Sequence, residues 1–368
     1  MNKAIYVPIL KWKQGEYTAL KELYVADKAL IQPLVELVPI PTPLEEDVEP
    51  PTLDEHIAKF PNQVEANWGC DQKIWVDASL LAEPAILANG QHAFAVIMDE
   101  LRKRNVKAVP VVYLDSPVLV LQAAATCNEV DGLGVVIRLD EEEADSPTIQ
   151  GELDSLLHQL GLAASDADIV LDAGSVSPEF VSRTAIICRY VLDRFPYVDE
   201  WRSLVFASSG FPVNMAAQAV GVSMIQRSDW LTWQAIKADF DEGRIPRLPV
   251  FGDYAIAHPE LADIDPRTMQ MSANIRYTSV DHWVIFKGRG VRRYGFGQIY
   301  DLCINLVGNA VYRGAGFSFG DKVYKLRADQ GDVYGKGNAS QWRRDATNHH
   351  LTFVVRQAQI NAEPVRVD

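Results

Sequence analysis

The stretch Leu133–Asp140, LGVVIRLD, is an apolar run whose only charged residues, Arg138 and Asp140, stand near its end. β-Branched residues favour strands, and a continuous apolar run of this length predicts a strand that is buried on both faces. The next run of this kind is Ala167–Gly174, ADIVLDAG, and the segment Ile149–Leu160 between them has helical spacing of its apolar residues. Two buried strands joined by a helix predict a parallel β-α-β unit.

The same alternation of apolar runs and helix-like segments recurs along the first 254 residues. The eight predicted strands are Ile5–Lys11, Gln32–Pro39, Lys73–Ser79, Lys107–Asp115, Leu133–Asp140, Ala167–Gly174, Arg202–Ser209 and Leu248–Tyr254. Eight units favour a closed (β/α)8 barrel of the TIM type, in the α/β class, over an open doubly wound sheet. No GxGxxG or GxxxxGK[ST] turn follows an early strand, so the dinucleotide-binding and P-loop alternatives have little support.

The last hundred residues have a different pattern. The predicted elements are a β pair at Asn274–Ser279 and His282–Lys287, a helix within residues 295–309, an irregular glycine-rich stretch at Arg313–Gly337 and a strand at Leu351–Val355. We therefore predict a barrel over residues 1–269 and a C-terminal α+β extension over 270–368. The extension is expected to pack on the barrel and not to fold independently.

The net charge of −14 is unevenly distributed along the chain. Residues 284–368 hold 13 Lys/Arg and 7 Asp/Glu, a balance of +6, which leaves −20 for residues 1–283. An acidic body repels a polyanion, so binding of generic duplex DNA is not expected. The basic tail either holds a phosphate locally or docks on the acidic body, and we favour docking because it needs no ligand.

The sequence points to a cytoplasmic protein with no membrane contact. No window is long and apolar enough to span a bilayer, and the N-terminus lacks the shape of a signal peptide. The four cysteines are scattered without CxxC spacing, which argues for reduced thiols and against a zinc cluster.

Charged residues end several of the predicted strands. They are Lys11, Glu36, Asp77, Arg138, Asp172 and Asp253. Catalytic side chains of (β/α)8 barrels collect where the strands end, because the eight βα loops converge there. Glu36, Asp77 and Asp172 are candidate ligands of a divalent metal, Mg²⁺ or Mn²⁺, or a candidate general base. Lys11, Arg138 and Asp253 are candidates for binding a small anionic substrate.

A purely structural role explains the same residues nearly as well. Burial ends where a strand ends, and aspartate is a good first residue of a helix, so Asp115 before Ser116 and Pro117 is expected to cap a helix. Arg227 and Asp229 are expected to form a salt bridge at the entrance to a helix.

Two adjacent histidines stand in TNHHLTFV, close to Arg343 and Asn348. If His349 and His350 belong to the predicted strand, they lie on opposite faces and cannot easily hold one metal together. One of them is then expected to face the barrel rim as a general acid, with Arg343 and Asn348 as neighbouring substrate contacts. The alternative is that both are ordinary surface residues and that Asn348 caps a turn.

Two terminal blocks, IYVPILKWKQGEYTAL and GFGQIYDLCINLV…YRGAGFSFGDK…WRRDATNHHLTFVVRQ, resemble the "beta protein" family of phage and bacterial proteins. The resemblance covers nearly the whole chain. It implies a shared fold and a role in phage–host conflict such as antiviral defence, and it supplies no catalytic residues.

Two functions are consistent with these features. The first is a barrel hydrolase that acts on a small anionic substrate, such as a phosphoester, with a divalent metal. The second is a non-catalytic recognition protein in phage–host conflict that binds a protein partner. The hydrolase requires the rim carboxylates to converge in one pocket, whereas the recognition protein predicts that they are spread apart or satisfied by internal Lys and Arg.

Overall fold

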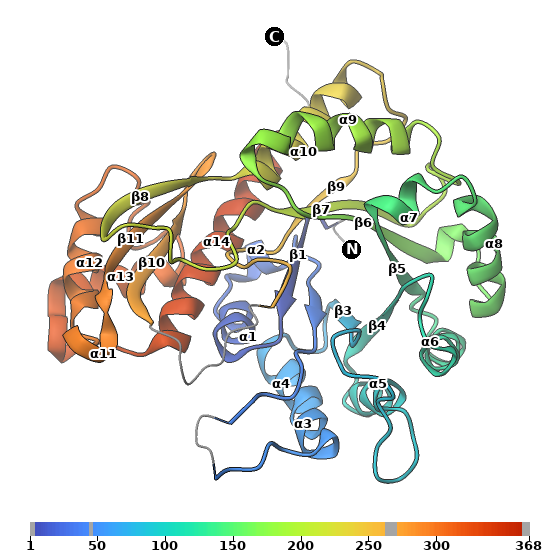
Figure 1. Ribbon diagram of the computed structural model, residues 1–368, viewed down its shortest axis with the longest axis horizontal. Coiled ribbons are helices and arrows are strands. Elements are labelled where there is room, and N and C mark those ends of the chain that lie inside the picture. Colours follow the sequence, from blue (N-terminus) through green and yellow to red (C-terminus); the bar gives the residue numbers. More distant parts are fainter. Residues whose placement is uncertain (1–3, 44–46, 262–270, 363–368) are drawn as a thin grey trace.

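The computed structural model of the chain describes residues 4–43, 47–261 and 271–362, where eight parallel strands close into a barrel beside a three-stranded sheet (Figure 1). The barrel strands are β1 (Tyr6–Lys11), β2 (Leu34–Glu36), β3 (Lys73–Asp77), β4 (Lys107–Val112), β5 (Val135–Asp140), β6 (Ala167–Ser175), β7 (Ser203–Ser209) and β9 (Val250–Asp253). β9 pairs with both β7 and β1 and so closes the ring. The prediction of a closed (β/α)8 barrel with these eight strands is confirmed.

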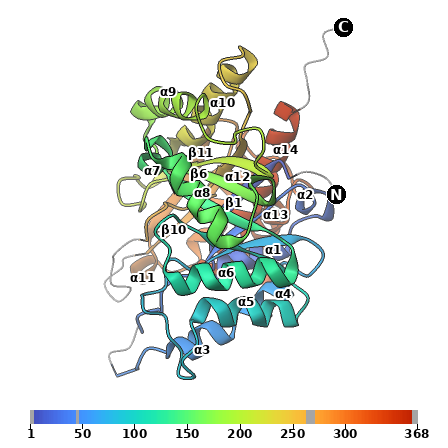
Figure 2. The ribbon, with the colours of Figure 1, turned by 90° about the vertical axis from the view of Figure 1, so that its right-hand side faces the viewer.

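Helices cover the outside of the barrel. They are α1 (Gln14–Lys21), α2 (Val25–Lys28), α3 (Leu53–Ala58), α4 (Phe60–Asn67), α5 (Ala93–Lys103), α6 (Val118–Asp131), α7 (Glu141–Asp145), α8 (Ile149–Leu160), α9 (Val181–Leu192) and α10 (Ser228–Asp241), with short 3-10 turns at Ala164–Asp166 and Pro178–Phe180. Figure 2 shows α5, α6 and α8 on the side of the barrel away from the extension.

Side chains of the barrel strands alternate between the interior and the helices, as the pleat of a strand requires. On β1, Val7 and Ile9 belong to the interior cluster, whereas Tyr6 and Leu10 pack in the cluster beneath the helices. The interior cluster also takes Leu34, Trp75, Val109, Val111, Val136, Val170, Val205 and Ala207 from the other strands. The phase of this alternation decides which residues at the strand ends face inward.

The second sheet has the order β10–β11–β8, and only two of its strands come from the C-terminal region. β10 (Ser272–Thr278) and β11 (His282–Gly290) confirm the predicted β pair. β8 (Gly221–Gln226) lies between β7 and α10 in the chain and pairs antiparallel with β11. The sequence analysis missed β8. The predicted domain boundary at 269/270 lies within residues 262–270, which are outside the described residues.

The glycine-rich stretch Arg313–Gly337 is not irregular throughout, so that prediction is wrong in part. The predicted helix before it is present as α12 (Gln298–Val307), after a short α11 (Val291–Tyr294). Within the stretch, α13 (Phe319–Gln330) forms a three-turn helix before the 3-10 turn Gly331–Val333. The Ser318 hydroxyl caps α13 by accepting from the Asp321 backbone N–H, and most glycines stand outside the helix.

The predicted strand Leu351–Val355 is also wrong, because these residues lie in the long helix α14 (Ala339–Ala362). Residues 345–355 of α14 are all buried, since the helix runs between α1 and β1 of the barrel and β10 and α13 of the extension (Figure 1). A helix that is buried on every side has no solvent-exposed polar face. A continuous apolar run in such a helix cannot be told from a buried strand by its periodicity.

The contact between α14 and the barrel is close. A Cβ on Gly15 of α1 would lie 2.5 Å from Cγ of Arg343 and 2.9 Å from the Ser340 carbonyl oxygen, so only glycine fits there. Further along, Asn348 is fully buried: its amide donates to the Ala19 carbonyl, and its side-chain oxygen accepts from the Gly320 N–H. Asn348 therefore joins α1, α13 and α14.

The described residues also bear on the expectations about membrane-spanning segments and cysteines. No helix among them combines the length and apolar character needed to cross a membrane. All four cysteines have free thiols, and three of them are buried.

Removal of the extension is expected to prevent cooperative folding. A chain of residues 1–269 loses α14 and the strand that pairs with β8, which exposes apolar surface of α1 and leaves Asp253 without His350. We expect an insoluble or molten product without a cooperative thermal transition by circular dichroism. Co-expression with residues 270–368 is the control, and a sharp melting transition of 1–269 alone would contradict the prediction.

Candidate functional site

The inward series of the barrel becomes polar at its C-terminal end. Five charged residues each stand two positions after an apolar residue of the interior: Lys11 after Ile9, Glu36 after Leu34, Asp77 after Trp75, Arg138 after Val136 and Asp172 after Val170. Their side chains therefore point into the barrel and meet above its apolar layers. This arrangement brings five of the predicted rim residues together.

Arg138 is the centre of this group. Its Nη1 donates to Glu36 Oε1 at 2.9 Å and to Asp77 Oδ2 at 2.8 Å, and its Nε and Nη2 donate to Asp172 Oδ2 at 2.9 and 2.7 Å. Nη2 also contacts the hydroxyl of Tyr254. One guanidinium on β5 thus binds carboxylates from β2, β3 and β6.

Lys11 and two tyrosines complete what we call the Arg138 cluster: Lys11, Glu36, Asp77, Tyr113, Arg138, Asp172 and Tyr254. Lys11 Nζ lies 3.1 Å from Glu36 Oε2 and also donates to the Pro259 carbonyl. Tyr113 and Tyr254 donate to Asp77 and Asp172. Burial and the adjacent carboxylates raise the pKa of both phenols, so both hydroxyls stay protonated.

The carboxylates of the cluster converge, as the hydrolase hypothesis requires, and they are satisfied internally, as the recognition hypothesis requires. Each accepts a hydrogen bond from Arg138, and Glu36 accepts a second one from Lys11. Across residues 4–43, 47–261 and 271–362, no group of three His, Cys, Asp or Glu is arranged to hold a metal ion. Glu36, Asp77 and Asp172 would accept a metal only after Arg138 moved away.

Two arginines of the extension meet at the same end of the barrel. Arg276 of β10 and Arg343 of α14 both donate through Nη1 to the carbonyl of Ile256, just after β9, at 2.9 and 2.7 Å. Both side chains are half-buried. Burial lowers both pKa values, and the charge of Arg343 lowers that of Arg276 further. Two like charges at one carbonyl oxygen attract an anion.

The surroundings of this arginine pair contain one buried carboxylate and one exposed amine. Glu16 of α1 is 5% exposed, and burial raises its pKa although Arg343 and Lys11 lower it. Its Oε2 has no hydrogen-bond partner among the described residues. Lys13 is exposed as a residue, but partial desolvation of its amine lowers its pKa, and the charges of Arg343 and Lys11 lower it further.

His258 is a site residue that the sequence analysis missed. It follows β9 and is partly exposed, and its Nδ1 accepts from the Glu260 N–H at 3.2 Å. The proton of the neutral ring is then on Nε2. Burial lowers the pKa of His258, and the charge of Lys11 lowers it further, so the ring is neutral at pH 7. A histidine soon after the eighth barrel strand was the available signal.

Asp253 does not face the barrel interior, although it ends β9. It stands one position out of phase with the inward Tyr254, and its Oδ1 accepts from the Tyr6 hydroxyl at 2.6 Å. Its Oδ2 lies 2.9 Å from Nε2 of His350. Asp253 therefore contacts the extension from the outer face of the barrel.

The two adjacent histidines are fully buried, so neither is a surface residue or a rim acid. Burial lowers the pKa of His350, and its neutral ring donates to Asp253 and accepts from the Thr278 hydroxyl at 2.8 Å. His349 faces two acceptors, the Asp321 carboxylate at 2.8 Å and the Thr278 carbonyl at 2.9 Å. Its two ring nitrogens therefore connect Asp321 of α13 to Thr278 of β10. His349 connects elements within the extension, and His350 connects the extension to the barrel.

The predicted salt bridge between Arg227 and Asp229 is not formed. Arg227 Nη1 donates instead to the Ser279 and Val280 carbonyls and to Gln357. Both Asp229 oxygens are buried and have no hydrogen-bond partner among the described residues. Burial raises the pKa of Asp229 to about 7, and the charge of Asp253 raises it as well. The predicted capping by Asp115 is also absent, since Pro117 is the N-cap residue of α6 and no side chain caps the helix.

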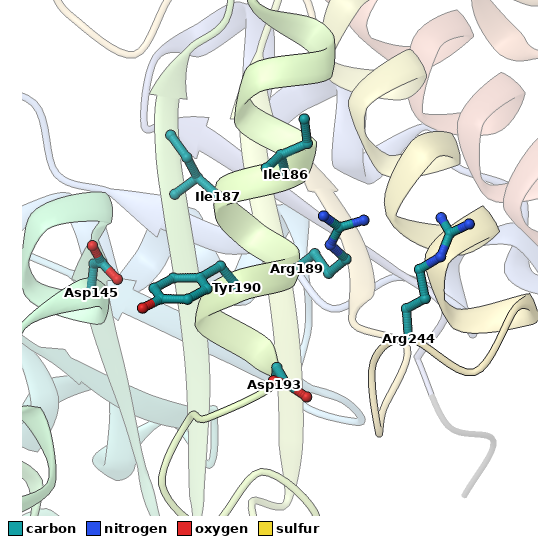
Figure 3. A pocket seen from close by; sticks show the side chains of 7 residues that line it. All are labelled: Asp145, Ile186, Ile187, Arg189, Tyr190, Asp193 and Arg244. Carbon is teal, nitrogen blue, oxygen red and sulfur yellow. The ribbon is translucent and has the colours of Figure 1, made fainter.

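Pockets lie both at the barrel mouth and away from it. One of about 380 Å³ adjoins the ends of β3 and β4 and reaches Asp77 and Tyr113. Another of about 500 Å³ lies on the outer surface of α9, where Figure 3 shows Ile186, Arg189 and Tyr190 with Arg244 beside them. Arg189 and Arg244 both pair with Asp239, so both arginines of the outer pocket have a carboxylate partner.

The profile of the Beta protein family matches residues 6–356. The chain belongs to this family. No curated protein matches the chain. Among solved structures, it is similar to triosephosphate isomerase from Bartonella henselae, with 14% sequence identity and a TM-score of 0.33. That similarity covers 67% of this chain and 90% of the isomerase.

Replacement of Arg138 by Met is expected to destabilise the protein strongly. Three buried carboxylates would lose their main partner, and breaking a buried ion pair on one side costs about 3–5 kcal/mol. Urea unfolding measures the loss. Adding Asp172→Asn and Asp77→Asn to Arg138→Met should restore part of it, whereas a stability unaffected by Arg138→Met would mean that the cluster is not formed.

Replacement of Asp229 by Asn is expected to stabilise the protein at alkaline pH. The folded-state pKa of about 7 lies above the ordinary value of 3.8, so the wild type loses stability as pH rises through this range. Asparagine does not titrate. The gain in Tm should therefore be small at acidic pH and reach about 5 °C above neutrality, since this shift corresponds to roughly 4 kcal/mol. A gain that is the same at all pH values would contradict the assignment.

Proposed function

We propose that this protein is a barrel enzyme that hydrolyses a small anionic substrate of the phosphoester class at the mouth of the barrel. The observation that carries the proposal is the meeting of Arg276 and Arg343 at the Ile256 carbonyl. These arginines contact the segment just after β9, at the end of the barrel where substrates of (β/α)8 barrels bind, and they come from the extension that packs beside the barrel.

The arginine pair is the proposed anion site. Arg343 uses Nη1 for the Ile256 carbonyl, so its Nε and Nη2 edge has no partner among the described residues. This edge matches two oxygens of a phosphate or carboxylate. The exposed Lys13 adds a third positive charge beside it. When ionised, Glu16 offsets part of the positive charge of the arginine pair. Its raised pKa reduces its repulsion of an anion.

His258 is the proposed hydrogen-bond donor to the anion at this site. Its Nε2 proton is directed by the hydrogen bond that Nδ1 accepts from Glu260, and its neighbour Lys11 favours negative charge nearby. The Nε2–H can therefore donate to an oxygen of the bound anion. His258 is the histidine of the proposed site in place of His349 and His350, which are fully buried. Because its ring is neutral, it would stabilise the anion by a hydrogen bond and would not act as a general acid.

The Arg138 cluster is the fixed floor of the proposed site. Its carboxylates are held by charge-assisted hydrogen bonds, which orient Tyr254 and Lys11 beneath the mouth. A divalent Mg²⁺ or Mn²⁺ at Glu36, Asp77 and Asp172 would supply a Lewis acid, and it would have to displace Arg138. We therefore propose that anion binding persists when divalent metal is removed.

Recognition of a protein partner is the second candidate function, and β8 supports it. β8 stands at the edge of its sheet, with Val220, Val222 and Met224 on or beside it exposed at 61%, 56% and 64%. Exposed apolar residues on an edge strand favour pairing with another chain. A partner in phage–host conflict would dock there without using the barrel mouth.

Replacement of Arg343 by Gln is expected to weaken the binding of inorganic phosphate by about tenfold or more, because a charge-assisted bidentate contact is lost. Isothermal titration calorimetry in the presence of EDTA measures this. Arg292→Gln, on the exposed surface of α11, is the matched control and should bind phosphate like the wild type. His258→Ala should lower kcat for p-nitrophenyl phosphate and weaken phosphate binding less than Arg343→Gln does, because a neutral hydrogen bond contributes less than a charge-assisted bidentate contact. Equal binding by the Arg343 and Arg292 variants would contradict the anion site.

A further inference from the structure

We propose that the pocket between the ends of β3 and β4 binds the hydroxyl-bearing, uncharged part of the substrate. This inference rests on the proposed function and names the substrate class more closely: a phosphorylated polyol or sugar. The pocket has a volume of about 380 Å³, which is within the usual range for small-molecule sites.

The lining of this pocket excludes an anion. Three carboxylates line it, those of Asp77, Glu83 and Asp115, and no lysine or arginine does. Asp77 is neutralised by Arg138, and Glu83 lies 3.3 Å from His92. The exposed Asp115 has no side-chain hydrogen bond among the described residues. It is left as an acceptor for hydroxyl groups of a ligand.

The remaining polar groups suit the same ligand. The Ser79 hydroxyl lies 3.3 Å from that of Tyr113, and the Tyr113 hydroxyl is committed to Asp77. Ser79 is exposed and can both donate and accept. Leu81, Phe94 and Val111 add apolar walls. Apolar walls with a few hydroxyl and carboxylate groups fit a carbon frame that carries several hydroxyls.

Two shared residues connect this pocket to the Arg138 cluster. Asp77 and Tyr113 line the pocket and belong to the cluster, whose Lys11 reaches Pro259 in the same segment as Ile256. Pocket and arginine pair therefore lie at the same end of the barrel with the cluster beneath them. The proposed substrate places its polyol in the pocket and its phosphate at the arginines, and it therefore has to reach across the cluster.

The test compares ribose 5-phosphate with methyl phosphate by calorimetry. We expect the sugar phosphate to bind the wild type at least about tenfold more tightly, since several hydrogen bonds of about 1 kcal/mol each are gained. Asp115→Ala should reduce this ratio toward one and leave inorganic phosphate affinity unchanged. Asp166→Ala, exposed at the opposite end of the barrel, is the control and should keep the wild-type ratio.

The outcomes separate the pocket from the proposed anion site. A ratio near one in the wild type, or a ratio that Asp115→Ala does not change, overturns the inference while phosphate binding upholds the proposed function. If inorganic phosphate does not bind, uncharged ribose tests the pocket alone by NMR titration of the whole protein. Chemical-shift changes that Asp115→Ala abolishes support the pocket, and their absence overturns it.

Discussion

The guanidinium of Arg138 satisfies carboxylates from three strands other than its own, and the top layer of the barrel depends on it. Without this cation, the buried Glu36 and Asp77 and the largely buried Asp172 would be three unpaired negative charges at the end of an apolar interior, which is unfavourable. With it, the layer keeps its ionised groups in fixed positions. The barrel therefore ends in a rigid polar floor, and adaptable groups stand above that floor on the βα loops and on the extension.

The extension depends on a second buried polar contact, that of His350 with Asp253. Because the imidazole bridges Thr278 of β10 and Asp253 of β9, the outer face of the barrel and the second sheet share one hydrogen-bonded unit. β8 adds another connection. It lies between β7 and α10 of the barrel region in the chain, and it pairs with β11 of the extension. The two sheets are thus connected by chain, by side chain and by α14. This explains why Arg276 and Arg343 can be held at a defined place over the barrel.

The strand order and most of the Arg138 cluster follow from the sequence, because both depend on local periodicity. The period of two that identifies a strand also places Lys11 in phase with Val7 and Ile9, and it places Asp253 out of phase with Tyr254. Applied at each strand end, it separates the residues that converge from the one that does not. The position of Asp253 at the end of its strand suggests a rim residue, whereas its phase places it on the outer face of the barrel.

Other features depend on contacts distant in sequence. α14 is buried on all sides, so LTFVV has no polar face to mark it as helical, and the tertiary surroundings decide its conformation. β8 lacks the buried character of the barrel strands because it is an edge strand. Arg276 and Arg343 meet only through the path of the extension. The spacing of residues within a short segment cannot predict a contact between residues so far apart in the sequence.

The dependence of the barrel on α14 has a consequence for synthesis on the ribosome. His350 follows Asp253 by 97 residues. At roughly 5–20 residues per second, the ribosome delivers this partner several seconds after all eight barrel strands have been made. During that interval the outer face of β1 and β9 is uncovered, and a carboxylate that is later buried still faces water. The nascent barrel therefore exposes this surface until α14, a helix that belongs to no barrel unit, has been made.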